Sequence, residues 1–234
     1  MVEQSTQQNH DKAALEELSQ DTASRKRFLK MVGGAGATGA LAIFVAACGN
    51  DEETDTGATG DTDTGMGAEK KASKGDLEIL NYALTLEFIE ADFYAAVIDS
   101  GEVTDKKIAE LAKSIGENEQ EHVDALTATI EQLGGKPAAK PSTTFDAVLQ
   151  GGPKMILATA ATVENLGAAA YLGQAGRIKN KDVLAAALSI HTVEARHAAA
   201  LNTLVGKTVV PDGAFAKPAS MKEVLPQIKP FLAS

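Results

Sequence analysis

Residues 80–94, LNYALTLEFIEADFY, set the pattern on which the rest of the chain is built. A glutamate, Glu87, interrupts their apolar periodicity, and a tyrosine, Tyr94, follows it seven residues later. Residues 161–171, ATVENLGAAAY, repeat the arrangement, because Tyr171 again follows Glu164 by seven residues. The recurrence indicates that the chain contains an internal repeat.

A Glu-x-x-His motif follows each of these two stretches by about one helix and a turn. The first is Glu119 with His122 in ENEQEH, and the second is Glu194 with His197 in TVEARH. Residues three apart on an α-helix share a face, so each pair can bind one ion together. The order Glu, E-x-x-H, Glu, E-x-x-H predicts an all-α, four-helix bundle that holds a carboxylate-bridged pair of metal ions.

Apolar side chains place these polar groups on the inward face of each predicted helix, at alternating three- and four-residue spacing. Buried carboxylates are costly without a positive partner. Two metal ions would neutralise the four buried carboxylates. Each ion would bind about two side chains of its own, and two carboxylates would bridge the ions. Pairing with Arg177, Arg196 or a lysine is the alternative. Glu90 is the rival of Glu87 on the first helix, and Glu87 is preferred because it keeps the seven-residue spacing to a tyrosine. The predicted metal ligands are Glu87, Glu119, His122, Glu164, Glu194 and His197.

On these motifs, about residues 75–206 resemble the ferritin-like superfamily, and LNYALTLEFIEADFY resembles its secreted or desiccation-related subgroup. The resemblance implies a long crossover between the second and third helices and two metal ions, iron foremost and manganese as the alternative. It also implies that Tyr94 and Tyr171 lie beside the metal ligands, as candidate catalytic residues.

The activity that this resemblance implies is redox chemistry on a small-molecule oxidant, peroxide or dioxygen, of the peroxidase, catalase or ferroxidase type. Non-catalytic iron sequestration, or a structural stress-protection protein with a vestigial metal site, are the alternatives. A formal net charge of −10 argues against nucleic acid as a partner. An oligomer is compatible with the sequence.

The N-terminal residues 1–47 are predicted to be an export signal. Residues 24–30, SRKRFLK, resemble a twin-arginine motif with Lys26 in place of its second arginine. The mildly apolar stretch that follows ends in VAAC at Cys48, the only cysteine, which resembles a lipidation site. An uncleaved membrane anchor or a buried thiol are the alternatives. We therefore expect an exported protein of the cell envelope or periplasm, anchored to a membrane by a lipid on Cys48.

Residues 48–74 are acidic and rich in Thr and Gly, which predicts a flexible tether. The bundle is expected over residues 75–206, with Asp76, Thr104 and Asn180 as helix N-caps. Residues 207–234 are expected to form a tail. Within it, Ser220 and Glu223 form a capping box that predicts a short helix packed on the outside of the bundle. Phe231 and Leu232 are its predicted anchors.

Overall fold

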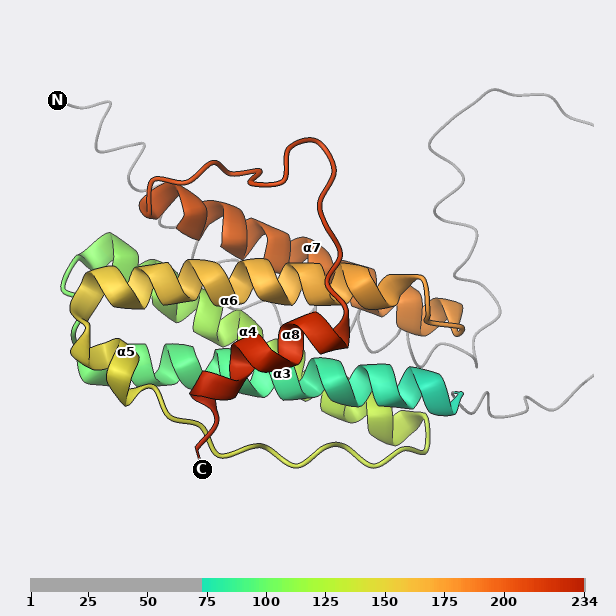
Figure 1. Ribbon diagram of the computed structural model, residues 1–234. Coiled ribbons are helices and arrows are strands. Elements are labelled where there is room, and N and C mark those ends of the chain that lie inside the picture. The colour runs from blue at the N-terminus through green and yellow to red at the C-terminus, as the bar shows by residue number, and fades with distance from the viewer. Residues whose placement is uncertain (1–72, 234) are drawn as a thin grey trace, which may run out of the picture.

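The computed structural model describes residues 73–233, which form an α-helical bundle with no strand. The predicted export signal, Cys48 and nearly all of the predicted tether lie outside the described residues. Within them, the all-α bundle predicted from the sequence is confirmed (Figure 1). Its long helices are α3 (Lys74–Ser100), α4 (Lys106–Gln132), α6 (Gly152–Ala175) and α7 (Lys181–Leu204).

The helices pack as two antiparallel pairs, α3 with α4 and α6 with α7, and the pairs meet chiefly through α3 and α6. The chain after α4 runs back along the length of the bundle before α6 begins, as the long crossover requires (Figure 1). A short helix that the sequence did not predict, α5 (Asp146–Gln150), lies at the end of this connection. Among the described residues, α6 is long and apolar enough to cross a membrane, but it serves here as a core helix of the bundle.

Two of the predicted helix caps are wrong, one by three residues and the other by one. The cap of α3 is Ser73, whose hydroxyl accepts from the backbone N–H of Asp76. The cap of α4 is Asp105 rather than Thr104. Asp76 is instead buried in the first turn of α3, where its carboxylate accepts two backbone N–H groups of the α6–α7 turn at 2.8 and 3.2 Å. It thereby ties the two helix pairs together, while Asn180 caps α7 as predicted.

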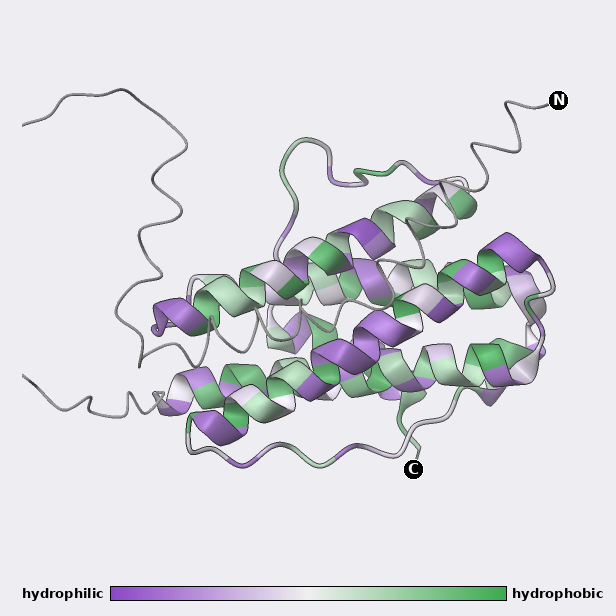
Figure 2. Ribbon diagram, turned by 180° about the vertical axis from the view of Figure 1, so that it is seen from behind, coloured by the Kyte–Doolittle hydropathy of each residue, from purple (hydrophilic) through white to green (hydrophobic). Residues whose placement is uncertain are grey.

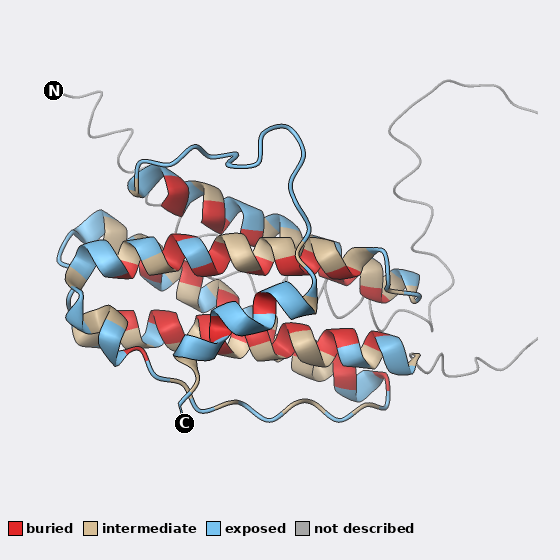
Figure 3. Ribbon diagram, viewed as in Figure 1, coloured by how far each residue is buried: buried red, intermediate tan, exposed pale blue. Residues whose placement is uncertain are grey.

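Apolar side chains fill the bundle at both ends, and buried positions face inward along all four long helices (Figure 3). Hydrophilic positions gather on the outer surface of the helices (Figure 2). One apolar cluster includes Leu84, Leu126 and Ile130, and the other includes Phe93 and Ile115. On α4 and α7, the Glu and His of each E-x-x-H motif fall between residues of the two clusters.

The C-terminal tail packs across the outside of α3 and α6 (Figure 1). It contains the predicted short helix, α8 (Met221–Ile228), which begins with the predicted capping box, and a 3-10 turn, η1 (Lys229–Phe231). The residues that anchor it most deeply are Val224 and Ile228, which are 0% and 3% exposed. The predicted anchors Phe231 and Leu232 are only partly buried against the same cluster.

Candidate metal centre

The structure brings all six predicted metal ligands together in one buried layer in the middle of the bundle. The four carboxylates are 0% exposed, which is unusual for ionisable groups. The two imidazoles reach solvent slightly, with side-chain exposures of 12% for His122 and 9% for His197. The six are Glu87 from α3, Glu119 and His122 from α4, Glu164 from α6, and Glu194 and His197 from α7.

These residues form two overlapping groups, each with one imidazole and three carboxylates, and the ligand atoms in each group lie within 4.8 Å of one another. The first group contains Glu87 and His122, and the second contains Glu164 and His197. Glu119 and Glu194 belong to both groups. The glutamates of the two E-x-x-H motifs are therefore placed to bridge, a distinction that the sequence could not make.

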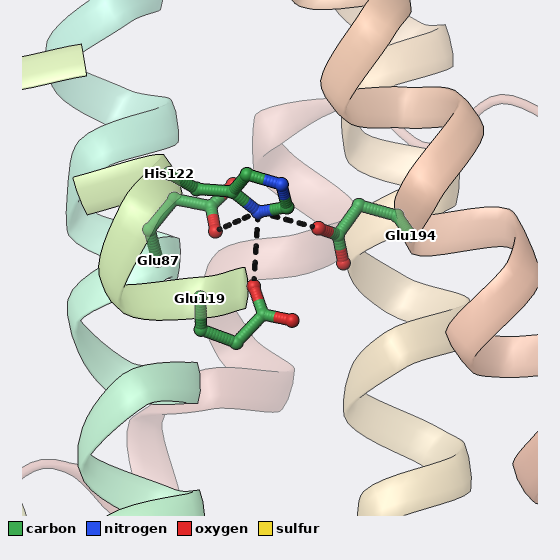
Figure 4. A group of neighbouring side chains, drawn as sticks. All are labelled: Glu87, Glu119, His122 and Glu194. Atoms are coloured by element: carbon green, nitrogen blue, oxygen red, sulfur yellow. Dashed lines mark hydrogen bonds and ion pairs between the residues drawn. The ribbon is translucent and has the colours of Figure 1, made fainter. Parts of the chain in front are cut away.

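The first group converges on one imidazole nitrogen (Figure 4). His122 Nδ1 lies 3.2 Å from Glu87 Oε2, 3.1 Å from Glu119 Oε2 and 3.1 Å from Glu194 Oε1. One ring nitrogen carries at most one hydrogen and cannot donate to three acceptors at once. Ligands set at right angles about 2.1 Å from a common cation lie about 3 Å from one another. The spacing of this group therefore fits a cation.

The second group contains buried polar atoms that make no hydrogen bond. His197 Nδ1 lies 2.9 Å from Glu119 Oε1 and 3.2 Å from Glu164 Oε2, but without hydrogen-bond geometry. Both oxygens of Glu194 also lack a hydrogen-bond partner among the described residues. Buried polar atoms in proteins are normally hydrogen-bonded. Orphaned oxygen and nitrogen atoms that converge on one region are the donor set of a metal site, so this group also fits a cation.

The two tyrosines of the repeat hold the carboxylates that belong to only one group. Tyr94 Oη, on α3, donates to Glu164 Oε1 on α6 at 2.6 Å. Tyr171 Oη, on α6, donates to Glu87 Oε1 on α3 at 2.5 Å. Each phenol therefore crosses to the opposite half of the repeat and leaves the second oxygen of that carboxylate facing the centre. The two tyrosines therefore hold two of the predicted metal ligands in place, and a catalytic role for them stays a prediction.

A family model for the ferritin-like domain matches residues 75–207. The chain belongs to the ferritin-like family. The match covers more than half of the sequence and includes the four long helices from residue 75 onward. No curated protein matches the chain. The family resemblance read from the repeated motifs is therefore confirmed at the level of the superfamily.

The ferritin-like bundle supports its centre with a residue that sequence reasoning missed. The side-chain amide of Asn118 lies 3.1 Å from His197 Nε2. An imidazole that ligates through Nδ1 carries its hydrogen on Nε2, and a partner for that hydrogen fixes the ring. The Asn118 atom facing Nε2 is the nitrogen Nδ2, and a 180° turn of the amide would place the oxygen there as the acceptor for this hydrogen. Its position directly before Glu119 gave no signal in the sequence, because nothing there marks an asparagine as a partner of a distant histidine.

Of the two glutamates considered on the first helix, Glu87 joins a ligand group and Glu90 does not. Glu90 is nevertheless almost completely buried, with an exposed fraction of 3%. The arginine alternative is not realised for Arg177, which donates to Gln174 instead.

Burial and mutual charge shift the pKa values of the ionisable groups in this centre. Burial raises the pKa of Glu194 well above its ordinary value, and the nearby Glu119 and Glu87 carboxylates raise it further. Burial also raises the pKa of Glu87 to about 7, against the opposing effect of His122. Burial alone would lower the pKa of His197, but hydrogen-bonding distance to Glu119 and Glu164 outweighs it and raises the value to about 9. The centre thus favours added positive charge, which a metal ion supplies in place of protons.

Proposed function

We propose that this is an exported, lipid-anchored protein of the secreted or desiccation-related ferritin-like subgroup. Its buried centre would hold two iron or manganese ions and carry out redox chemistry on peroxide or dioxygen. The observation that carries the metal proposal is the pair of overlapping ligand groups that share Glu119 and Glu194. Carboxylate and imidazole ligands suit iron and manganese, and iron is the first expectation.

The six ligand side chains have distinct tasks in this proposal. Glu119 and Glu194 would bridge, while Glu87 with His122, and Glu164 with His197, would each complete one position. A metal pair bound by these residues would supply Lewis acidity and reversible electron exchange. The protein excludes bulk water by burying every carboxylate of the two ligand groups. The hydroxyls of Tyr94 and Tyr171 fix the two carboxylates that belong to only one group, Glu164 and Glu87.

The side of the bundle between α4 and α7 is the proposed approach for the oxidant. His122 and His197, one from each of these helices, are the members of the centre that reach solvent. The helices α4 and α7 also pack against each other much less closely than each packs against its own pair partner. A small oxidant can therefore reach the imidazole edge of the centre without passing the buried carboxylates.

Peroxide disproportionation is the reaction that needs no further reactant. One hydrogen peroxide molecule loses two electrons and two protons and becomes dioxygen. A second takes up those two electrons and two protons, its O–O bond breaks, and two water molecules form. Glu119 and Glu194, with the other four ligands, would hold a metal pair able to store the two electrons between these half-reactions.

Iron binding without turnover is the second candidate, and the complete burial of the four carboxylates favours it. In that case two ferrous ions each lose one electron. Dioxygen takes up the two electrons and two protons to give hydrogen peroxide, and the ferric ions stay bound. The two candidates differ in whether peroxide accumulates or disappears.

Metal counting and two activity assays on the purified protein separate these candidates. We expect two iron or manganese ions per chain, and loss of both metal and activity in Glu119→Ala and Glu194→Ala. Glu121→Ala, an exposed position on the same helix, is the matched control and should behave like the unchanged protein. Peroxide consumption that survives in both bridging variants would refute the catalytic proposal. Ferrous oxidation with retained iron but no peroxide consumption would support sequestration.

The export and anchoring proposals rest on residues 24–30 and on Cys48. A twin-arginine route carries folded proteins, so the metals could be inserted before export. The test is metabolic labelling with a radioactive fatty acid, with Cys48→Ala as the control. Label that persists in Cys48→Ala, or a protein retained in the cytoplasm, would contradict this part of the proposal.

A further inference from the structure

Glu90 is a fifth buried carboxylate for which the two ligand groups give no role. It lies on α3 almost one turn beyond Glu87 and is 3% exposed. Its Oε2 atom has no hydrogen-bond partner among the described residues. A carboxylate buried without a partner costs free energy. Burial raises its pKa well above the ordinary value, and the negative charges of Glu194 and Glu87 raise it further.

The opposite helix makes room for this carboxylate through Gly167. A Cβ atom at Gly167 would lie 2.7 Å from Glu90 Oε1 and 3.3 Å from Glu194 Oε2. The first distance is shorter than real contacts of a Cβ atom, so any residue other than glycine at position 167 would displace the Glu90 carboxylate. The absent side chain therefore allows the carboxylates of Glu90 and Glu194 to lie beside the same point of the backbone.

Glu90 and Gly167 occupy equivalent positions in the internal repeat. Glu90 is three residues after Glu87, and Gly167 is three residues after Glu164. One half of the repeat thus supplies an additional acid, and the other half supplies the space for it. The two halves of the centre are unequal at this place.

The geometry also shows which ion position Glu90 adjoins. Glu194 Oε1 faces His122 of the first group at 3.1 Å, which leaves Oε2 for the second group. The Glu90 carboxylate lies on the Oε2 side of Glu194, because both oxygens surround Gly167. Glu90 therefore adjoins the position formed with Glu164 and His197.

A small pocket lies beside Glu90. Glu90 is the only charged residue in its lining, so no lysine or arginine neutralises the carboxylate there. A cation in the centre would give this carboxylate a positive partner. The other lining residues are Leu86, Ile89, Val163, Leu166, Gly167 and Ile228.

We propose that Glu90 is a fifth carboxylate ligand, specific to the ion position of Glu164 and His197, and that the two positions therefore bind cations with unequal affinity. This inference rests on the proposed metal pair. Four carboxylates balance the charge of two divalent ions, so the position that gains a fifth has the stronger attraction for a cation.

Manganese titration of the metal-free full-length chain tests the inference, with isothermal calorimetry and electron paramagnetic resonance of free Mn²⁺ as the readouts. We expect two binding events whose dissociation constants differ by about tenfold or more, the usual effect of one supporting group at a metal site. Glu90→Gln keeps the size of the side chain and removes its charge. It should weaken the tighter event by about tenfold or more and leave the other unchanged. Glu121→Gln, an exposed change of the same kind on α4, is the control.

Gly167→Ala tests the same ligand without altering Glu90, because the added methyl group approaches Glu90 Oε1 more closely (2.7 Å) than Glu194 Oε2 (3.3 Å) and displaces the Glu90 carboxylate first. It should weaken the tighter event as Glu90→Gln does, and circular dichroism verifies that each variant folds. If Glu90→Gln does not fold, Gly167→Ala decides the question. Two equal binding events in the unchanged protein, or two unequal events unaffected in the folded variants, would overturn this inference alone. Absence of Mn²⁺ binding by the unchanged protein would overturn the proposed function as well.

Discussion

The chain has three tyrosines, and the structure gives two of them a hydrogen bond that the third lacks. Tyr94 and Tyr171 donate to buried carboxylates at 2.6 and 2.5 Å. Tyr82 Oη is buried but has no hydrogen-bond partner among the described residues. Replacement of each by phenylalanine removes the same oxygen atom, so a comparison of the three variants isolates the contribution of the hydrogen bond.

The expected effect follows from the burial of the acceptors. Glu164 and Glu87 are both 0% exposed, so water cannot replace a lost phenol. A hydrogen bond to a charged group contributes about 1.5–3 kcal/mol. We expect Tyr94→Phe and Tyr171→Phe each to lower the free energy of unfolding by about 2 kcal/mol, or the melting temperature by about 4–8 °C. Tyr82→Phe should be neutral or slightly stabilising, because it removes a buried hydroxyl that has no partner.

Equilibrium urea unfolding of the chelator-treated protein at pH 8 provides the measurement. Metal release then does not enter the equilibrium, and Glu87, whose pKa is about 7, is mostly ionised. A double-mutant cycle of Tyr171→Phe with Glu87→Gln measures the coupling of this pair directly. If Tyr82→Phe costs as much as the other two changes, the phenols only fill volume and the positioning role is wrong. A Tyr171→Phe change without cost would lead to the same conclusion.

Three further outcomes follow from the structure. Metal-free protein should lose stability as pH rises from 6.5 to 9, because folded His197, with a pKa of about 9, keeps a proton that the unfolded chain releases. Urea midpoints measured across this pH range should show that the free energy of unfolding falls by about 3 kcal/mol from this group. A free energy of unfolding that does not change with pH would contradict the prediction. Gly173→Ala should expose the C-terminal tail to limited proteolysis, because a Cβ there would lie against the Ala219 carbonyl oxygen, whereas Gly176→Ala, with open space around it, should not. Metal at a thousand times its dissociation constant should add about 4 kcal/mol to the free energy of unfolding. Chelation should remove this contribution and lower the melting temperature, and an unchanged melting temperature would indicate a vestigial site.

Local features of the sequence were sufficient for much of the fold. The apolar spacing predicted the bundle, and Asn180 and the Ser220–Glu223 capping box were found because their partners lie within three residues. The misplaced cap at Asp76 has the opposite cause. Its carboxylate binds backbone groups more than a hundred residues away, a partner that no local pattern reveals.

The sequence by itself determined that Glu, E-x-x-H, Glu, E-x-x-H would lie on the inner faces of four helices, because helical periodicity fixes which residues share a face. Only the tertiary structure decided that Glu119 and Glu194 are shared between the two ligand groups, that Glu90 is buried beside Glu194, and that each tyrosine crosses to the opposite half. These choices depend on atoms from different helices meeting within about 3 Å. The packing of one helix against another sets such distances, and the periodicity of a single helix does not contain them.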